Sequence, residues 1–150
     1  MLRDDINAAL TAAMKAQDKP RLSALRLISA ALKNLDIEAR TAGKDTPADD
    51  AVLGLLQKLV KQRQEAAELY DRGARPELAA QERAEIAVIQ AFLPAQMSEA
   101  EARAAIAGAI RESGAASVKD MGKVMAALRS RYAGRMDFGK ASALVKGMLG

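Results

Sequence analysis

Apolar residues recur at intervals of three and four along most of this chain, and no run alternates between apolar and polar residues with period two. Intervals of three and four place side chains on one face of an α-helix, whereas alternation is typical of a β-strand. The abundant Ala, Leu, Glu, Lys, Arg and Gln residues also favour helices. The sequence therefore predicts an all-α protein.

Residues that begin or end helices divide the chain into seven expected helices. Asp18 and Pro20 suit one helix start, and Thr46 and Pro47 suit another as its cap and its first helical residue. Gly73 suits a helix end. The helices are expected over about residues 2–16, 20–43, 47–72, 77–92, 98–112, 117–133 and 137–149.

The segment FLPAQMSEAE, residues 92–101, marks a domain boundary. Pro94 ends a helix because the residue before a proline avoids helical geometry. Ser98 and Glu101 then match a capping box that starts the next helix. We therefore predict a four-helix N-terminal domain over residues 1–93 and a small three-helix tail domain over residues 95–150, with their mutual orientation left open.

The positive charge of the chain is confined to the predicted tail domain. The net charge is +4, and residues 1–94 hold equal numbers of basic and acidic residues, whereas residues 95–150 hold nine basic and five acidic ones. A basic unit attached to a neutral one suggests a polyanionic partner. A solvated basic face is the alternative, and the charge alone leaves both interpretations open.

The residue inventory excludes several kinds of chemistry. The chain has no Cys and no His, so a Ser-His-Asp triad and a Cys nucleophile are excluded, and the commonest metal ligand is missing. No phosphate-binding glycine loop appears; a Ser–Lys pair remains formally open. The pairs Asp4/Asp5 and Asp49/Asp50 lie at expected helix starts, where the helix dipole explains them. We predict no catalytic residue, no metal and no cofactor.

The location of the protein is expected to be cytoplasmic. No stretch reaches the roughly 18 apolar residues that a membrane-spanning helix needs, so no membrane association is predicted. The first residues carry Arg3, Asp4 and Asp5 without an apolar core after them, which is unlike a signal peptide.

The expected helix over residues 117–133 has an apolar face and a basic face. Its apolar face carries Met121, Val124, Met125, Leu128 and Tyr132. These side chains are predicted to form a core, and a methionine-rich partner groove is the alternative. The opposite face carries two lysines and the flanks two arginines, and we expect these exposed groups to contact phosphates.

Gly122 lies between the two faces, close to the helix start, and has two interpretations. Its missing side chain could let a neighbouring helix pack closely, which is the favoured interpretation. It could instead let a phosphate approach the helix N-terminus, where free N–H groups and the helix dipole favour anions. Both can hold together.

The turn AGRMD, residues 133–137, places Arg135 in a loop and Asp137 at a helix cap. Phosphate contacts from such residues give salt-dependent binding with little sequence specificity. Because aromatic residues are few, a structured RNA is expected in preference to a stacked single strand. The predicted RNA-binding residues are Lys119, Gly122, Lys123, Arg129, Arg131, Arg135 and Lys140.

A polar patch is expected on the third helix of the N-terminal domain, from Lys58, Lys61, Gln62 and Arg63. The favoured interpretation is that these side chains are solvated or paired with acidic residues of the same helix, Glu65, Glu68 and Asp71. A surface for a protein partner is the alternative.

The tail segment SVKDMGKVMAALRSRYAGRMDFGKASALVKGML, residues 117–149, strongly resembles the YqeY-like proteins, a bacterial family. Residues 14–34, 58–75 and 85–101 resemble the family as well, so the resemblance covers nearly the whole chain. Met136 and Phe138 depart from the family pattern, in which a small residue and a glycine are frequent at these positions.

The resemblance implies a helical N-terminal domain and a helical tail related to the tail domain of the B subunit of aspartyl/glutamyl-tRNA amidotransferase. That tail helps to hold the tRNA, while ATP-dependent activation and glutamine hydrolysis take place elsewhere. The family label is carbon–nitrogen ligase with glutamine as amido-N-donor. This chain is therefore expected to carry no catalytic residues for that reaction.

Three functions are considered. The favoured one is a non-catalytic accessory protein that binds tRNA or another structured RNA. The second is a component of a glutamine-dependent tRNA amidotransferase reaction whose active-site residues come from other subunits. The third is an adaptor that binds a protein partner through the N-terminal helices.

Overall fold

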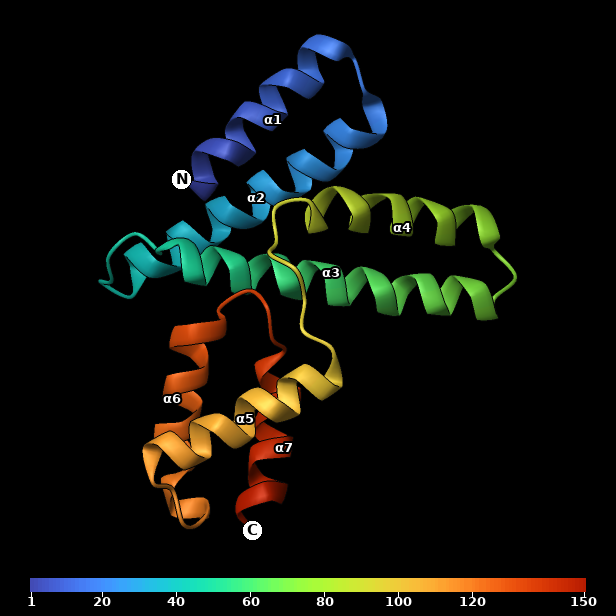
Figure 1. Cartoon of the computed structure of the whole chain (residues 1–150). Coiled ribbons are helices and arrows are strands. Elements are labelled where there is room, and N and C mark those ends of the chain that lie inside the picture. Colours follow the sequence, from blue (N-terminus) through green and yellow to red (C-terminus); the bar gives the residue numbers. More distant parts are fainter. The chain divides into compact units, whose positions relative to one another are not determined.

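The computed structural model describes all 150 residues, and every regular element in it is helical (Figure 1). The elements are α1 (Leu2–Ala16), α2 (Lys19–Thr41), α3 (Asp49–Arg72), α4 (Pro76–Gln90), α5 (Glu99–Ser113), the 3₁₀ turn η1 (Val118–Asp120), α6 (Met121–Tyr132) and α7 (Phe138–Leu149). The predicted all-α fold is confirmed. No helix combines the length and the apolar character required to cross a membrane.

The helices group into two compact units, Met1–Pro94 with α1 to α4 and Ala95–Gly150 with α5 to α7. The predicted arrangement of four helices followed by three is confirmed. Each unit has its own apolar core, and the two cores share no residue.

The four-helix unit is built on the antiparallel pair α3 and α4, against which α2 packs, with α1 lying along α2 (Figure 1). Its core lies where apolar faces of the four helices meet. The fully buried members with the largest side chains are Ile6, Leu25, Ile28, Val52, Leu56 and Ile89. Each helix contributes at three- and four-residue intervals, as the sequence predicts.

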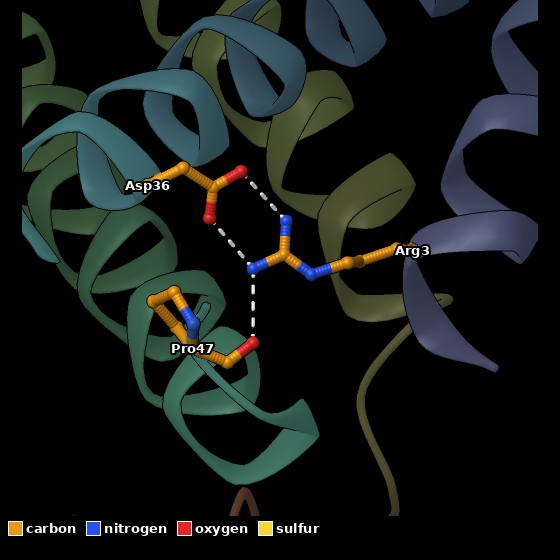
Figure 2. A network of polar contacts seen from close by, with 3 residues as sticks. All are labelled: Arg3, Asp36 and Pro47. Atoms are coloured by element: carbon orange, nitrogen blue, oxygen red, sulfur yellow. Dashed lines mark hydrogen bonds and ion pairs between the residues drawn. The ribbon is translucent and has the colours of Figure 1, made fainter. Parts of the chain in front are cut away.

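A network of polar contacts ties the start of α1 to α2 and to the loop before α3 (Figure 2). The Arg3 guanidinium donates two parallel hydrogen bonds to the Asp36 carboxylate, at 2.9 and 2.8 Å, and a third at 3.0 Å to the carbonyl oxygen of Pro47. The Arg3 and Asp36 side chains are about one third exposed or less. Partial burial and bidentate geometry make this the strongest candidate for a stabilising ion pair.

The start of α3 differs from the prediction. The helix begins at Asp49, its N-cap is Ala48, and no side chain caps it, so Thr46 is not the cap and Pro47 is not helical. The carbonyl of Pro47 accepts a hydrogen bond from Arg3, a residue of α1. This contact between elements holds Pro47 in the loop, and no local sequence signal reports it.

The three-helix unit closes around a core that includes two methionines. Ile106, Val124, Leu128 and Val145 are completely buried, while Met125 is 5% exposed. Met121 and Tyr132 pack at the edge of this core. The apolar face of residues 121–132 is therefore a core face, as predicted, and the alternative of an exposed methionine-rich partner groove on this face is wrong.

The sequence predicts that residues 117–120 form the first turn of an α-helix, but in the structure they do not. Val118–Asp120 form a 3₁₀ turn, and α6 starts only at Met121. The Asp120 carboxylate accepts hydrogen bonds from the backbone N–H groups of Ala116 and Ser117, at 3.0 and 3.4 Å. These bonds satisfy the free donors at the helix start and favour the tighter turn.

Candidate nucleic-acid interface

The acidic groups of the three-helix unit are engaged in contacts within that unit. Glu99 pairs with Arg103 at 3.0 Å, and Glu112 pairs with Arg131. Glu101 completes the capping box with Ser98 at the start of α5. Hydrogen bonds from the Ser98 backbone and side chain, together with the charge of Arg135, lower the pKa of Glu101. Few carboxylates therefore remain to neutralise the exposed basic side chains.

Lys119 and Lys123 lie at the start of α6, both exposed and without an ion-pair partner. Lys123 is close enough to Asp120 to lower the pKa of that carboxyl, after the larger effect of the backbone hydrogen bonds from Ala116 and Ser117. The two lysines thus present charge to solvent at one end of the unit.

The end of α7 lies beside the start of α6. A Cβ atom on Gly150 would lie 3.9 Å from a methyl group of Val118. Lys146, in the last turn of α7, therefore lies near the same end of the unit as Lys119 and Lys123. Lys146 is one of the nine basic residues of the tail, but the sequence did not predict it as an RNA-binding residue. The reason is that the contact between α7 and η1 joins residues far apart in the sequence.

Arg129 and Arg131, unlike the lysines, contact other side chains of the unit. The Arg131 guanidinium pairs with Glu112 at the end of α5, a contact that raises the pKa of Arg131. The Arg129 guanidinium lies 5.9 Å from the centre of the Phe138 ring, within the range of a cation–π contact. Both arginines remain exposed, so each retains N–H groups that face solvent.

Arg135 lies in the turn before α7, as predicted, and the structure also gives it a structural role. Its Nε donates to the carbonyl of Ala95 at 3.1 Å, and its own carbonyl accepts from the N–H of Met97 at 2.9 Å. Gln96 donates to the carbonyl of Gly134 at 2.5 Å. These three bonds, which we call the clasp, join segment 95–97 to the turn before α7.

Asp137 caps α7 as predicted, by accepting hydrogen bonds from the N–H groups of Gly139 and Lys140 at 2.9 and 3.2 Å. The Lys140 side chain is exposed and has no ion-pair partner. Lys140 therefore presents an unneutralised charge beside the clasp.

The predicted residues fall into two groups at opposite ends of α6. Lys119 and Lys123 lie at its start, whereas Arg135 and Lys140 follow its end. Twelve residues of α-helix span about 18 Å, so the two groups cannot meet on one phosphate. The arrangement suits a phosphate backbone that runs along the unit.

Gly122 is exposed, and a Cβ atom built on it would have no other atom within 4 Å. The favoured interpretation, close packing of a neighbouring helix, is therefore wrong. The interpretation that remains is access of a phosphate to the backbone at the start of α6, where the N–H of Met121 is already bonded to the Val118 carbonyl.

Gly122→Ala is expected to leave the fold intact and to raise its stability by up to about 1 kcal/mol, because alanine has the higher helix propensity and meets no obstacle. Chemical denaturation of both proteins measures this difference. A loss of stability would contradict the open environment of Gly122. Weaker RNA binding at unchanged stability would indicate that a phosphate approaches the backbone here.

One residue of the polar patch on α3, Arg63, is paired differently from the prediction. Arg63 donates to Glu85 of α4 at 3.1 Å and to the carbonyl of Leu59, instead of pairing with an acidic residue of its own helix. Asp71 pairs with Arg83 of α4. The close packing of α3 on α4 brings these partners together, and sequence spacing within α3 does not reveal them.

The structure contains no group of three or more His, Cys, Asp or Glu side chains placed to hold a metal ion.

The fold and the exposed cations define a class of protein: an all-helical chain of two units, whose smaller unit is basic. The chain matches the family model described as Yqey-like protein over residues 3–149. It therefore belongs to the YqeY-like family, as the resemblance of its tail segment predicts. A search of curated proteins finds no match.

Proposed function

We propose that this protein is a non-catalytic accessory protein that binds a structured RNA, with tRNA as the first candidate, through its three-helix unit. The observation that carries the proposal is the set of exposed lysines without ion-pair partners, at positions 119, 123 and 140, in a unit whose carboxylates are engaged internally. Uncompensated cations release counterions when they meet phosphates, which drives binding.

The distribution of the cations supports a structured RNA. The two groups lie at opposite ends of α6, a helix about 18 Å long, and this placement suits the extended backbone of a folded RNA. Exposed aromatic side chains, on which a single strand would stack, are few. The resemblance of the tail segment to a tRNA-holding domain makes tRNA the first RNA to test.

The test is a titration of the full chain with total tRNA across a salt series. About four phosphate contacts would lower the affinity roughly 150-fold between about 50 and 200 mM salt. The double variant Lys119→Glu/Lys123→Glu is expected to bind at least about tenfold more weakly, and the slope of log affinity against log salt should shrink by about two.

The matched control is Lys15→Glu/Lys33→Glu, which makes the same change in net charge at exposed lysines of α1 and α2. It is expected to bind almost as the parent protein does. Equal weakening in both variants would show attraction to net charge without a site. No binding at low salt would overturn the RNA proposal and favour a protein partner of the N-terminal helices.

A further inference from the structure

A groove of about 520 Å³ lies within the three-helix unit, next to the clasp. Its walls come from the segment that leads into α5, the turn before α7, and α7 itself. Its floor is largely apolar: Met97, Ala102, Met136, Ala141 and Leu144. A volume of this size lies in the range of small-molecule sites.

The groove is held in shape by hydrogen bonds within the unit. The clasp fixes segment 95–97 against residues 134 and 135. The capping box of Ser98 and Glu101 sets the start of α5, and Asp137 sets the start of α7. A groove whose walls are already fixed loses little conformational entropy when a ligand enters.

The charges at the rim favour an anion at one place. Glu99 is paired with Arg103, and Asp137 is used in capping α7, so both carboxylates are engaged. Lys140 lines the groove and has no ion-pair partner. Arg135 also lines the groove, where its Nε is used in the clasp. The groove therefore combines apolar side chains with the cation of Lys140.

We infer that this groove receives one unpaired nucleotide of the bound RNA, with the base against the apolar floor and its phosphate at Lys140. This inference rests on the proposed function and adds a subsite to it. A nucleotide has the required chemistry, a flat, largely apolar base joined to one anion, and structured RNAs present unpaired bases in loops, bulges and ends. A groove of this kind would make unpaired nucleotides a determinant of RNA choice.

The test compares two synthetic RNA hairpins of equal charge, each closed by the same non-nucleotide linker, one with a fully paired stem and one with a single bulged 2-aminopurine in its stem. The parent protein is expected to bind the bulged hairpin about tenfold more tightly, a difference of about 1.4 kcal/mol, and to change its fluorescence, because only the bulged base can enter the groove. Ala143 is an exposed residue of the groove wall. Ala143→Phe should fill the groove and remove the preference.

The control variant is Ala104→Phe, which adds the same ring at an exposed position of α5 outside the groove. It should keep the preference for the bulged hairpin. If Ala143→Phe perturbs the fold, as judged by its circular dichroism, Ala143→Leu replaces it, and Lys140→Ala should lower the preference independently.

The outcomes separate the subsite from the proposed function. Equal affinity of the parent protein for both hairpins, or a preference that survives Ala143→Phe, overturns the groove inference while RNA binding stands. Weakening of both hairpins by the same factor in Ala143→Phe overturns it as well. Failure of tRNA and of both hairpins to bind overturns the proposed function itself.

Discussion

Leu128→Ala is expected to unfold the three-helix unit, residues 95–150, while the four-helix unit keeps its structure. Leu128 is completely buried in the core of that unit. Removing a buried leucine costs about 2–5 kcal/mol, through lost transfer free energy and the cavity left behind. A unit of 56 residues buries only about 60% of the surface that its unfolded chain exposes and is marginally stable, so this loss is comparable to its whole stability.

Hydrogen exchange measured residue by residue distinguishes the two units. Amides of residues 95–150 should lose protection in Leu128→Ala, while those of residues 1–94 keep theirs, because the two cores share no residue. The control is Met148→Ala, which truncates a side chain that is 44% exposed and should change stability by less than about 0.5 kcal/mol. Loss of protection throughout the chain would show that the two units unfold together.

Removal of the Arg3 side chain is expected to destabilise the four-helix unit. Arg3→Ala breaks two hydrogen bonds to Asp36 and one to the Pro47 carbonyl, and it leaves the Asp36 carboxylate unpaired. Charge-assisted, bidentate bonds at partly buried positions are worth more than surface pairs, so a loss of about 1–2 kcal/mol is expected. Urea denaturation followed by circular dichroism measures this loss of stability in the unfolding transition of the four-helix unit.

A double-mutant cycle with Asp36→Ala isolates the Arg3–Asp36 interaction, and a coupling free energy of about 1 kcal/mol is expected. Arg75 and Glu77 provide the comparison, because that pair has both side chains 61% exposed and should couple by less than about 0.5 kcal/mol. Equal coupling in the two cycles would show that partial burial adds nothing to the Arg3 contact.

Much of the secondary structure could be predicted because it depends on signals close together in the sequence. The capping box of Ser98 and Glu101, the cap at Asp137 and the end of α3 at Gly73 all stand where the residue types predict. Intervals of three and four in residues 121–132 likewise identified the core face of α6, because side-chain direction in a helix follows from position alone.

The candidate site could be predicted only as a set of residue types in one part of the chain. The exposed state of Lys119, Lys123 and Lys140 agrees with the expected basic surface. Their separation into two groups was not foreseen, and neither was the engagement of Arg135 in the clasp. Sequence spacing within one helix says nothing about which residue of another helix supplies a partner.

The all-helical fold, the helix caps at Ser98 and Asp137 and the excess positive charge after Pro94 follow from the sequence alone, because composition, periodicity and charge are local properties. Tertiary structure alone decided that Pro47 stays outside α3, that Gly122 is open and that Arg131 is neutralised by Glu112. The physical reason is the same in each case, since these features depend on atoms that chain folding brings together from distant positions, or keeps apart.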